Sequence, residues 1–220
     1  RSRQQIYATP LDVDVLFALH PLLEVRSDNP RITPLFDNAG DHGYWGSGAP
    51  SYEALSVAAR PPPERLREVR SGFAPARDYY TQLPDLPPRV GELADSLTQG
   101  LDNNYDRATA ISDFFQTEFL YTLALPGSAR EATLEYFLFE RGEGHCEYFS
   151  TAMLVLLRSL GIHAREVNGF LGGQWNDFGQ YLAVTQNEAH SWVEVWFPGY
   201  GWVQFDPTPG GAGGSAAVTS

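Results

Sequence analysis

The spacing of hydrophobic residues changes twice along the chain, and its first part is typical of a β-rich region with irregular connections. Short apolar runs predict strands at residues 6–19, 22–26 and 52–59, whereas residues 36–43, with their Asp, Asn and Gly, predict a loop. Proline interrupts the chain at Pro61-Pro62-Pro63 and again within 83–88. These breaks favour a boundary near residue 80, with a β-rich N-terminal region over residues 1–80.

From residue 89 onward the apolar positions follow a helical period. The pattern predicts helices at 90–97, 102–119, 131–139 and 146–160. Ala108, Ile111 and Phe115 share one face of the second helix, and Gly161 is a typical C-terminal cap for the fourth.

Beyond residue 163 the period shortens to that of β-strands. Strands are predicted at 164–171, 180–185, 190–197 and 202–206, and the glycine-rich residues 210–220 predict a flexible linker. Helices followed by a run of neighbouring strands are typical of an α+β fold with an antiparallel sheet. We therefore predict one folded core over residues 81–209.

Composition narrows the class of protein. An apolar content of 43% indicates a globular chain, and the net charge of −12 argues against a nucleic-acid partner. The longest strongly apolar stretch, 152–157, is far shorter than the roughly 20 residues that a membrane span needs, and no signal peptide precedes Arg1. We expect a soluble chain that is a piece of a larger protein. Its single cysteine excludes an internal disulfide and leaves the redox compartment open.

That cysteine, Cys146, begins the predicted helix 146–160. Free backbone N–H groups and the positive end of the helix dipole stabilise an anion there by about 0.3–1 kcal/mol, which favours a thiolate. The same N–H groups can hold a developing oxyanion, and Gly142 and Gly144 allow close approach of a substrate. A buried, inert cysteine is an equally good interpretation of this helix taken alone.

His190 and Asp206 lie on two strands joined by a turn at Pro198-Gly199-Tyr200-Gly201. A turn centred on Pro198 places them directly opposite each other, and one centred on Gly199 makes them diagonal neighbours, with Cβ atoms roughly 4.5–8 Å apart in either case. Each residue alone has an ordinary structural explanation. Together with Cys146 they supply a thiol nucleophile, its base and an acid that orients the base, so we predict a Cys146-His190-Asp206 triad.

Other groupings of polar residues are weaker. Asp102, Asn104 and Asp106 have the opening spacing of a calcium loop, but Arg107 replaces the required glycine, and a helix start explains them better. A zinc site built from His145, Cys146, His190 and Asp206 is disfavoured because the adjacent His-Cys lacks ligand spacing. Trp175, Trp192 and His145 are candidate substrate-binding residues. Packing in a half-buried sheet is the alternative for the tryptophans, and simple exposure is the alternative for His145.

Several motifs in the order found here resemble the transglutaminase-like superfamily, and most closely its bacterial membrane-anchored branch of TgpA-type proteins. The matching segments run from about residue 105 to 208 and include Gly144-His145-Cys146-Glu147-Tyr148-Phe149-Ser150, Ala189-His190-Ser191-Trp192-Val193-Glu194-Val195 and Asp206-Pro207-Thr208. Departures are mild: His163 replaces the usual proline, Phe170 a tyrosine, and Glu188-Ala189-His190-Ser191-Trp192 the usual Asp-Ala-His-Ala-Trp.

The resemblance implies a papain-like core in which the cysteine helix packs on a sheet that carries histidine and aspartate. It implies a cysteine acyltransferase that forms a thioester from a glutamine carboxamide and passes the acyl group to a primary amine or to water, with no metal or organic cofactor. The partners would be protein or peptide substrates that supply the glutamine and the amine. It also implies a periplasmic or other extracytoplasmic domain, held by membrane spans that the sequence given does not contain. A peptidase or amidase acting on peptide or cell-wall material, and a non-catalytic interaction module, stay open as alternatives.

Overall fold

The computed structural model describes residues 1–9, 14–27, 29, 32–36, 42–46, 50–57, 60–70, 79–124 and 126–210. The chain forms two compact units, Arg1–Pro61 and Pro62–Ser220. This division lies before the predicted boundary near residue 80. The reason is that helix α1 (Pro63–Arg67) packs on helix α3 (Asn104–Glu118) of the second unit. Arg67 Nε of α1 donates to Asp106 Oδ1 of α3 at 2.8 Å. The predicted limits of the catalytic core, residues 81–209, stay a prediction.

The described residues of the first unit form five strands. Three of them form an antiparallel sheet in the order β1-β5-β2, and two form a hairpin. Their bounds are β1 Ser2–Tyr7, β2 Leu22–Arg26, β3 Ile32–Phe36, β4 His42–Gly46 and β5 Ser51–Ser56. The strand predicted at 22–26 is confirmed, and the one predicted at 52–59 is confirmed as β5, with residues 58–59 outside the described part.

One expectation for this unit is wrong, and a second is wrong at its ends. The strand predicted over 6–19 ends at Tyr7. Further along this segment, Leu16 is buried, and the backbone N–H and carbonyl of Phe17 both hydrogen-bond to the Tyr52 phenol. The loop predicted over 36–43 has both its ends in strands, because Phe36 pairs with His42. Residues 37–41 lie outside the described part of the chain.

The helices of the second unit follow the predicted order. Their bounds are α1 Pro63–Arg67, η1 Tyr79–Thr81, α2 Pro88–Leu97, α3 Asn104–Glu118, α4 Leu134–Tyr136, the π-helix η2 Phe137–Arg141, α5 Cys146–Ser159 and η3 Gln186–Glu188. The helices predicted at 90–97, 102–119 and 146–160 are confirmed as α2, α3 and α5. The one predicted from 131 begins at Leu134, because Thr133 caps it by accepting from the Tyr136 amide, and its second half is the π-helix. None of the described helices is both long enough and apolar enough to cross a bilayer.

The strands of this unit form an antiparallel sheet and two small ladders. Their bounds are β6 Leu120–Tyr121, β7 Glu143–Gly144, β8 Ala164–Phe170, β9 Gln174–Asn176, β10 Tyr181–Ala183, β11 Ala189–Phe197 and β12 Gly201–Phe205. The main sheet has the order β12-β11-β8, β9 pairs with β10, and β6 runs parallel to β7. The strands predicted at 164–171, 190–197 and 202–206 are confirmed as β8, β11 and β12, and the one predicted at 180–185 is the shorter β10.

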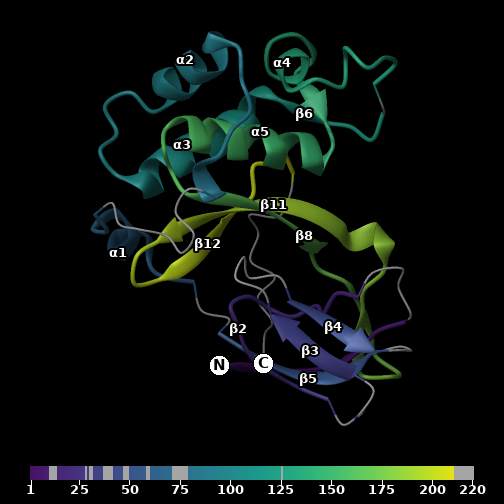
Figure 1. Cartoon of the computed structure of the whole chain (residues 1–220). Helices are drawn as coiled ribbons and strands as arrows, with labels where there is room; N and C mark the ends of the chain where they lie inside the picture. The colour runs from purple at the N-terminus through teal and green to yellow at the C-terminus, as the bar shows by residue number, and fades with distance from the viewer. Residues whose placement is uncertain are drawn as a thin grey trace. The chain divides into compact units, whose positions relative to one another are not determined.

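Helices α2, α3 and α5 gather on one face of the β12-β11-β8 sheet (Figure 1). The core between them is apolar, with Phe149, Met153 and Leu156 of α5 and Val193 and Val195 of β11 fully buried. Alternation along β11 explains this, because every second side chain faces the helices. The predicted α+β class is therefore confirmed, including the cysteine-bearing helix packed on an antiparallel sheet and the β-rich region before it.

Candidate active site

Cys146 is the first residue of α5 and is partly exposed. The residue before it, His145, has extended backbone and makes no side-chain capping bond. Among the α-helices of the described residues, α5 alone begins with neither a side-chain cap nor a proline in its first turn, since α3 and α4 are capped by Asn103 and Thr133, and α1 and α2 begin with proline. The Tyr148 amide donates to the His145 carbonyl at 3.0 Å, so the amides that can bind an anion beside the sulfur are those of Cys146 and Glu147.

Helix α5 is fixed to the sheet next to that first turn. Ser150 Oγ donates to Glu166 Oε1 of β8 at 2.6 Å, and Thr151 Oγ1 lies 3.3 Å from the other oxygen of the same carboxylate. Ser150 itself is fully buried. Because Ser150 lies one turn after Cys146, these bonds set where the sulfur stands relative to the strands.

His190 and Asp206 are in direct contact, with Nε2 of the imidazole 2.8 Å from Oδ2 of the carboxylate. Both side chains are largely covered, with exposed fractions of 11% and 10%. Because a carboxylate oxygen accepts, Nε2 donates in this bond, which leaves Nδ1 for a proton-transfer partner. The sheet register explains the contact: Val193 pairs with Phe205 and Val195 with Val203, so a turn centred on Gly199 makes the two residues diagonal neighbours.

Helix α3 anchors the backbone of Asp206. Gln116 Nε2 donates to the Asp206 carbonyl oxygen at 2.7 Å, and Ser112 Oγ donates to the same atom at 3.1 Å. The other carboxylate oxygen, Oδ1, accepts from the Thr208 amide at 3.0 Å. Asp206 is thus held on three sides, so its carboxylate keeps one orientation toward His190.

Trp192 lies beside the imidazole of His190, with ring centroids 6.4 Å apart and the planes inclined by 23°. Its indole passes over Gly169 of β8, the residue that pairs with His190 across the sheet. A Cβ at position 169 would come within 2.7 Å of the Trp192 ring, so only glycine gives the indole this place. The position of this neighbour of His190 therefore depends on Gly169.

The short parallel pair β6-β7 adds a phenol near the sulfur. Tyr121 pairs with Gly144, two residues before Cys146, and the Thr122 amide donates to the Gly144 carbonyl at 2.8 Å. Burial and, secondarily, the nearby Cys146 thiol raise the pKa of Tyr121. Tyr121 thus lies within electrostatic reach of the thiol while keeping 46% of its surface exposed.

The residues predicted for substrate binding have different surroundings. His145 precedes Cys146 directly, packs its ring edge-on against Tyr148 and lies 3.9 Å from Glu147. Trp192 adjoins His190, whereas Trp175 is on the β9-β10 hairpin with 57% of its surface exposed. Their roles in binding stay predictions, and so do the catalytic roles of Cys146, His190 and Asp206.

Four residues that support the site were not predicted to do so from the sequence, namely Ser112, Gln116, Glu166 and Gly169. One signal was available: Ser112 and Gln116 are polar residues four positions apart beside the apolar stripe of α3. The helix-start explanation of residues 102–106 agrees with the structure, where Asn103 caps α3. Hydrogen bonds from Asn103 and then Arg67 lower the pKa of Asp106.

A model of the transglutaminase-like superfamily matches residues 91–207, more than half of the chain and the whole of this site. The chain belongs to the transglutaminase-like superfamily. The predicted papain-like transglutaminase core is thereby confirmed.

Relatives and solved structures agree with this assignment. The Bacillus subtilis (strain 168) protein YebA is 39% identical over 201 residues, covering 86% of this chain and 27% of YebA. A protein-glutamine gamma-glutamyltransferase of Pseudomonas aeruginosa is 41% identical over 149 residues, covering 66% of this chain and 22% of that protein. A crystal structure of the periplasmic domain of TgpA from P. aeruginosa superposes with a TM-score of 0.75 at 32% identity, covering 93% of this chain and 71% of that one. The chain spans only about a quarter of the length of these curated relatives.

Proposed function

We propose that this domain is a cysteine acyltransferase of transglutaminase type, with Cys146 as nucleophile, His190 as base and acid, and Asp206 as the group that orients His190. The observation that carries the proposal is the 2.8 Å His190–Asp206 contact on the strand against which the Cys146 helix packs. The supporting comparison is the similarity to a protein-glutamine gamma-glutamyltransferase.

The reaction has two halves. In the first, His190 Nδ1 takes the thiol proton, Sγ attacks the carboxamide carbon of a glutamine, and the amides of the first turn of α5 stabilise the oxyanion. The C–N bond then breaks, and ammonia leaves with the proton from His190, which gives a γ-glutamyl thioester. In the second half, a primary amine loses a proton to His190 and attacks the thioester carbon. The C–S bond breaks and the thiol recovers its proton; water in place of the amine yields glutamate.

The support for His190 in this cycle comes from its fixed neighbours. Asp206 stabilises the imidazolium that forms in each half, and the α3 bonds to the Asp206 carbonyl keep the carboxylate in place. Trp192 lies near the ring, with the two centroids 6.4 Å apart. Preorganisation of this kind lowers the barrier because little rearrangement is left for the reaction itself.

We further propose that the domain works outside the cytoplasm, as part of a membrane-anchored protein whose spans lie in segments other than this one. The similarity to a periplasmic domain of TgpA supports this location. Its substrates would be proteins or peptides that present a glutamine, with a lysine side chain or another primary amine as acceptor.

The test is incubation of the domain with a glutamine-containing peptide and a fluorescent primary amine, followed by mass spectrometry of the peptide. We expect amine incorporation with loss of ammonia in the wild type and none with Cys146→Ala. Cleavage of the peptide backbone would favour the peptidase alternative. Equal and negligible turnover by both proteins, with glutamine-rich peptides of varied sequence, would support a non-catalytic module.

A further inference from the structure

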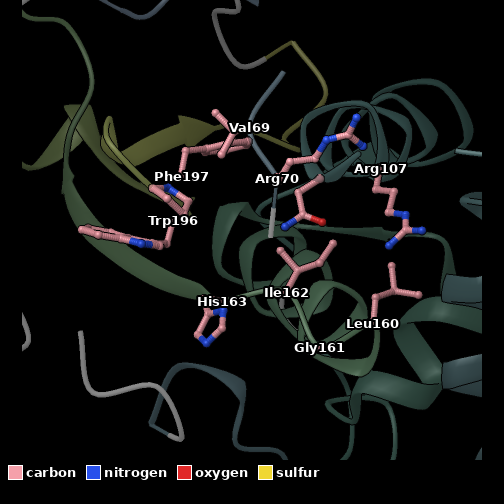
Figure 2. A pocket seen from close by; sticks show the side chains of 11 residues that line it. Val69, Arg70, Arg107, Leu160, Gly161, Ile162, His163, Trp196 and Phe197 are labelled. Atoms are coloured by element: carbon pink, nitrogen blue, oxygen red, sulfur yellow. The ribbon is translucent and has the colours of Figure 1, made fainter. Parts of the chain in front are cut away.

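A cavity of the Pro62–Ser220 unit is lined by none of the three residues of the candidate triad. It has a volume of about 180 Å³ and is bounded by the end of α5, the end of β11, the first turn of α3 and the residues that follow α1. Figure 2 shows the Arg70 and Arg107 side chains on one side of this cavity, with Trp196 and Phe197 on the other.

Among the described residues, the charged side chains that line the cavity are of one sign. Arg70 and Arg107 both line it, and none of these lining residues is a carboxylate. This matters because the chain has a net charge of −12, and most arginines described in this unit are neutralised by a carboxylate within 4 Å. The neutralised set is Arg65, Arg67, Arg89, Arg130, Arg141 and Arg165.

Arg158 instead donates three hydrogen bonds to two backbone carbonyls, those of Gln82 and Ala164. Within the described part of this unit, the arginines that have no carboxylate in bonding distance and face a common space are thus Arg70 and Arg107. Two guanidinium groups in one cavity repel each other unless an anion lies between them.

The polar side chains that line the cavity can also donate hydrogen bonds to an oxyanion. Arg107 Nε donates to the Leu101 carbonyl at 2.9 Å, which orients the guanidinium and leaves its two terminal nitrogens for a ligand. Asn104, one turn earlier on α3, adds a carboxamide to the lining. Three donor groups fit a tetrahedral oxyanion better than a planar carboxylate, which offers only two oxygens.

We propose that this cavity is a binding site for a small phosphate-type oxyanion. Its volume holds about six water molecules, which is less than the roughly 300 Å³ at which pockets for drug-sized ligands begin. The oxyanion belongs either to free phosphate or to the headgroup of an anionic lipid, since the same three donors would recognise both.

The site is remote from the thiol. Cys146 and Leu160 lie at opposite ends of α5, about 20 Å apart along the helix, and His190 and Trp196 are separated by a similar length of β11. Binding here is therefore independent of the proposed acyl transfer, and it is measured without any glutamine substrate. The failure of one proposal leaves the other standing.

The experiment is a titration of the domain with sodium phosphate at constant ionic strength, with sodium chloride as the balancing salt, followed by calorimetry and by the melting temperature. We expect saturable binding at one site and a melting temperature that rises with phosphate. Arg70→Gln and Arg107→Gln should each weaken binding at least about tenfold, the loss expected when one charge-assisted hydrogen bond is removed.

Matched variants separate the cavity from general charge. Arg65→Gln removes the same charge from the exposed surface of α1, where Arg65 pairs with Glu68, and should leave phosphate binding unchanged. Arg107→Lys keeps the positive charge but lacks the planar guanidinium, so it should bind phosphate with intermediate affinity. This variant also keeps the proposal testable if Arg107→Gln fails to fold.

A second arm replaces free phosphate with phosphatidylcholine vesicles that contain phosphatidylglycerol. Vesicle binding that Arg70→Gln abolishes and Arg65→Gln preserves identifies a lipid headgroup as the source, and phosphate binding without vesicle binding identifies a free oxyanion. The proposal is overturned if neither probe binds, or if Arg65→Gln weakens binding as much as Arg70→Gln does.

Discussion

Gly169 is the position where a single methyl group tests the architecture of the site most sharply. It lies on β8 opposite His190, and the Cβ of an alanine there would lie 2.7 Å from Cη2 and 3.2 Å from Cζ3 of Trp192. Carbon atoms pack at about 3.5–4.0 Å, so the methyl group overlaps the indole by about 1 Å. Either the indole or strand β8 must move, and the indole lies against the His190 ring.

The expected magnitudes follow from that overlap. Overpacking of this size lowers the free energy of unfolding by about 1–3 kcal/mol. Displacement of a catalytic group by about 1 Å can cost a factor of about one hundred in rate, so kcat for amine incorporation should fall by roughly ten- to one-hundredfold.

The assay pairs Gly169→Ala with Gly91→Ala on α2, where a new Cβ meets nothing within 4 Å. Gly91→Ala should stabilise the domain by about 0.5–1 kcal/mol and leave kcat unchanged. Adding Trp192→Phe to Gly169→Ala removes the two clashing ring atoms and should restore part of the lost stability. If Gly169→Ala has the stability and kcat of the wild type, the inferred clash between the new methyl group and Trp192 is wrong.

Three further predictions concern Gln116, Glu166 and Tyr52. Gln116→Leu removes the 2.7 Å bond to the Asp206 carbonyl and should lower stability by about 1 kcal/mol and kcat by more than KM changes; a pure KM effect in steady-state kinetics would contradict this. Glu166→Ala leaves the buried Ser150 hydroxyl without its carboxylate and should cost about 1–3 kcal/mol in urea unfolding, so an unchanged midpoint would count against it. Burial raises the pKa of Tyr52 to about 12, above the value of about 10 in the unfolded chain, so stability should be lost as pH rises from about 10 to about 12. Tyr52→Phe should lack that part of the loss, and unfolding curves of identical pH dependence for both proteins would exclude the effect.

The elements nearest the site could be predicted because their signals are local. Helix α5 combines an apolar stripe with Gly161 at a φ of +70°, a conformation that suits glycine, and β11 alternates between core and opposite face along its length. The turn after β11 left two registers open. The structure has the one centred on Gly199, where Gly199 and Gly201 have φ of +84° and +85°.

Elements with weak local signals were missed. Hairpin β3-β4 contains Pro34 and Gly43, both poor strand formers, and the pairing between the strands rather than an apolar run defines it. The π-helix after α4 was also beyond prediction, because its bonding pattern has no distinct sequence period.

For the site, the sequence predicted a contact between His190 and Asp206, which is present, whereas the catalytic roles of Cys146, His190 and Asp206 stay a proposal. The supporting residues could not be predicted in the same way. Gln116 meets the Asp206 carbonyl from 90 positions earlier in the chain, and only the tertiary fold brings them together.

The proposed acyl transfer requires Cys146 to carry the acyl group during turnover. The most direct measurement is intact-protein mass spectrometry after rapid acid quenching of the domain mixed with a glutamine dipeptide donor, without any added amine. We expect a covalent adduct with the mass of the donor minus ammonia, mapped to Cys146, absent from Cys146→Ala and formed more slowly by Asp206→Asn. An adduct on another residue, or donor turnover that persists in Cys146→Ala, would contradict it.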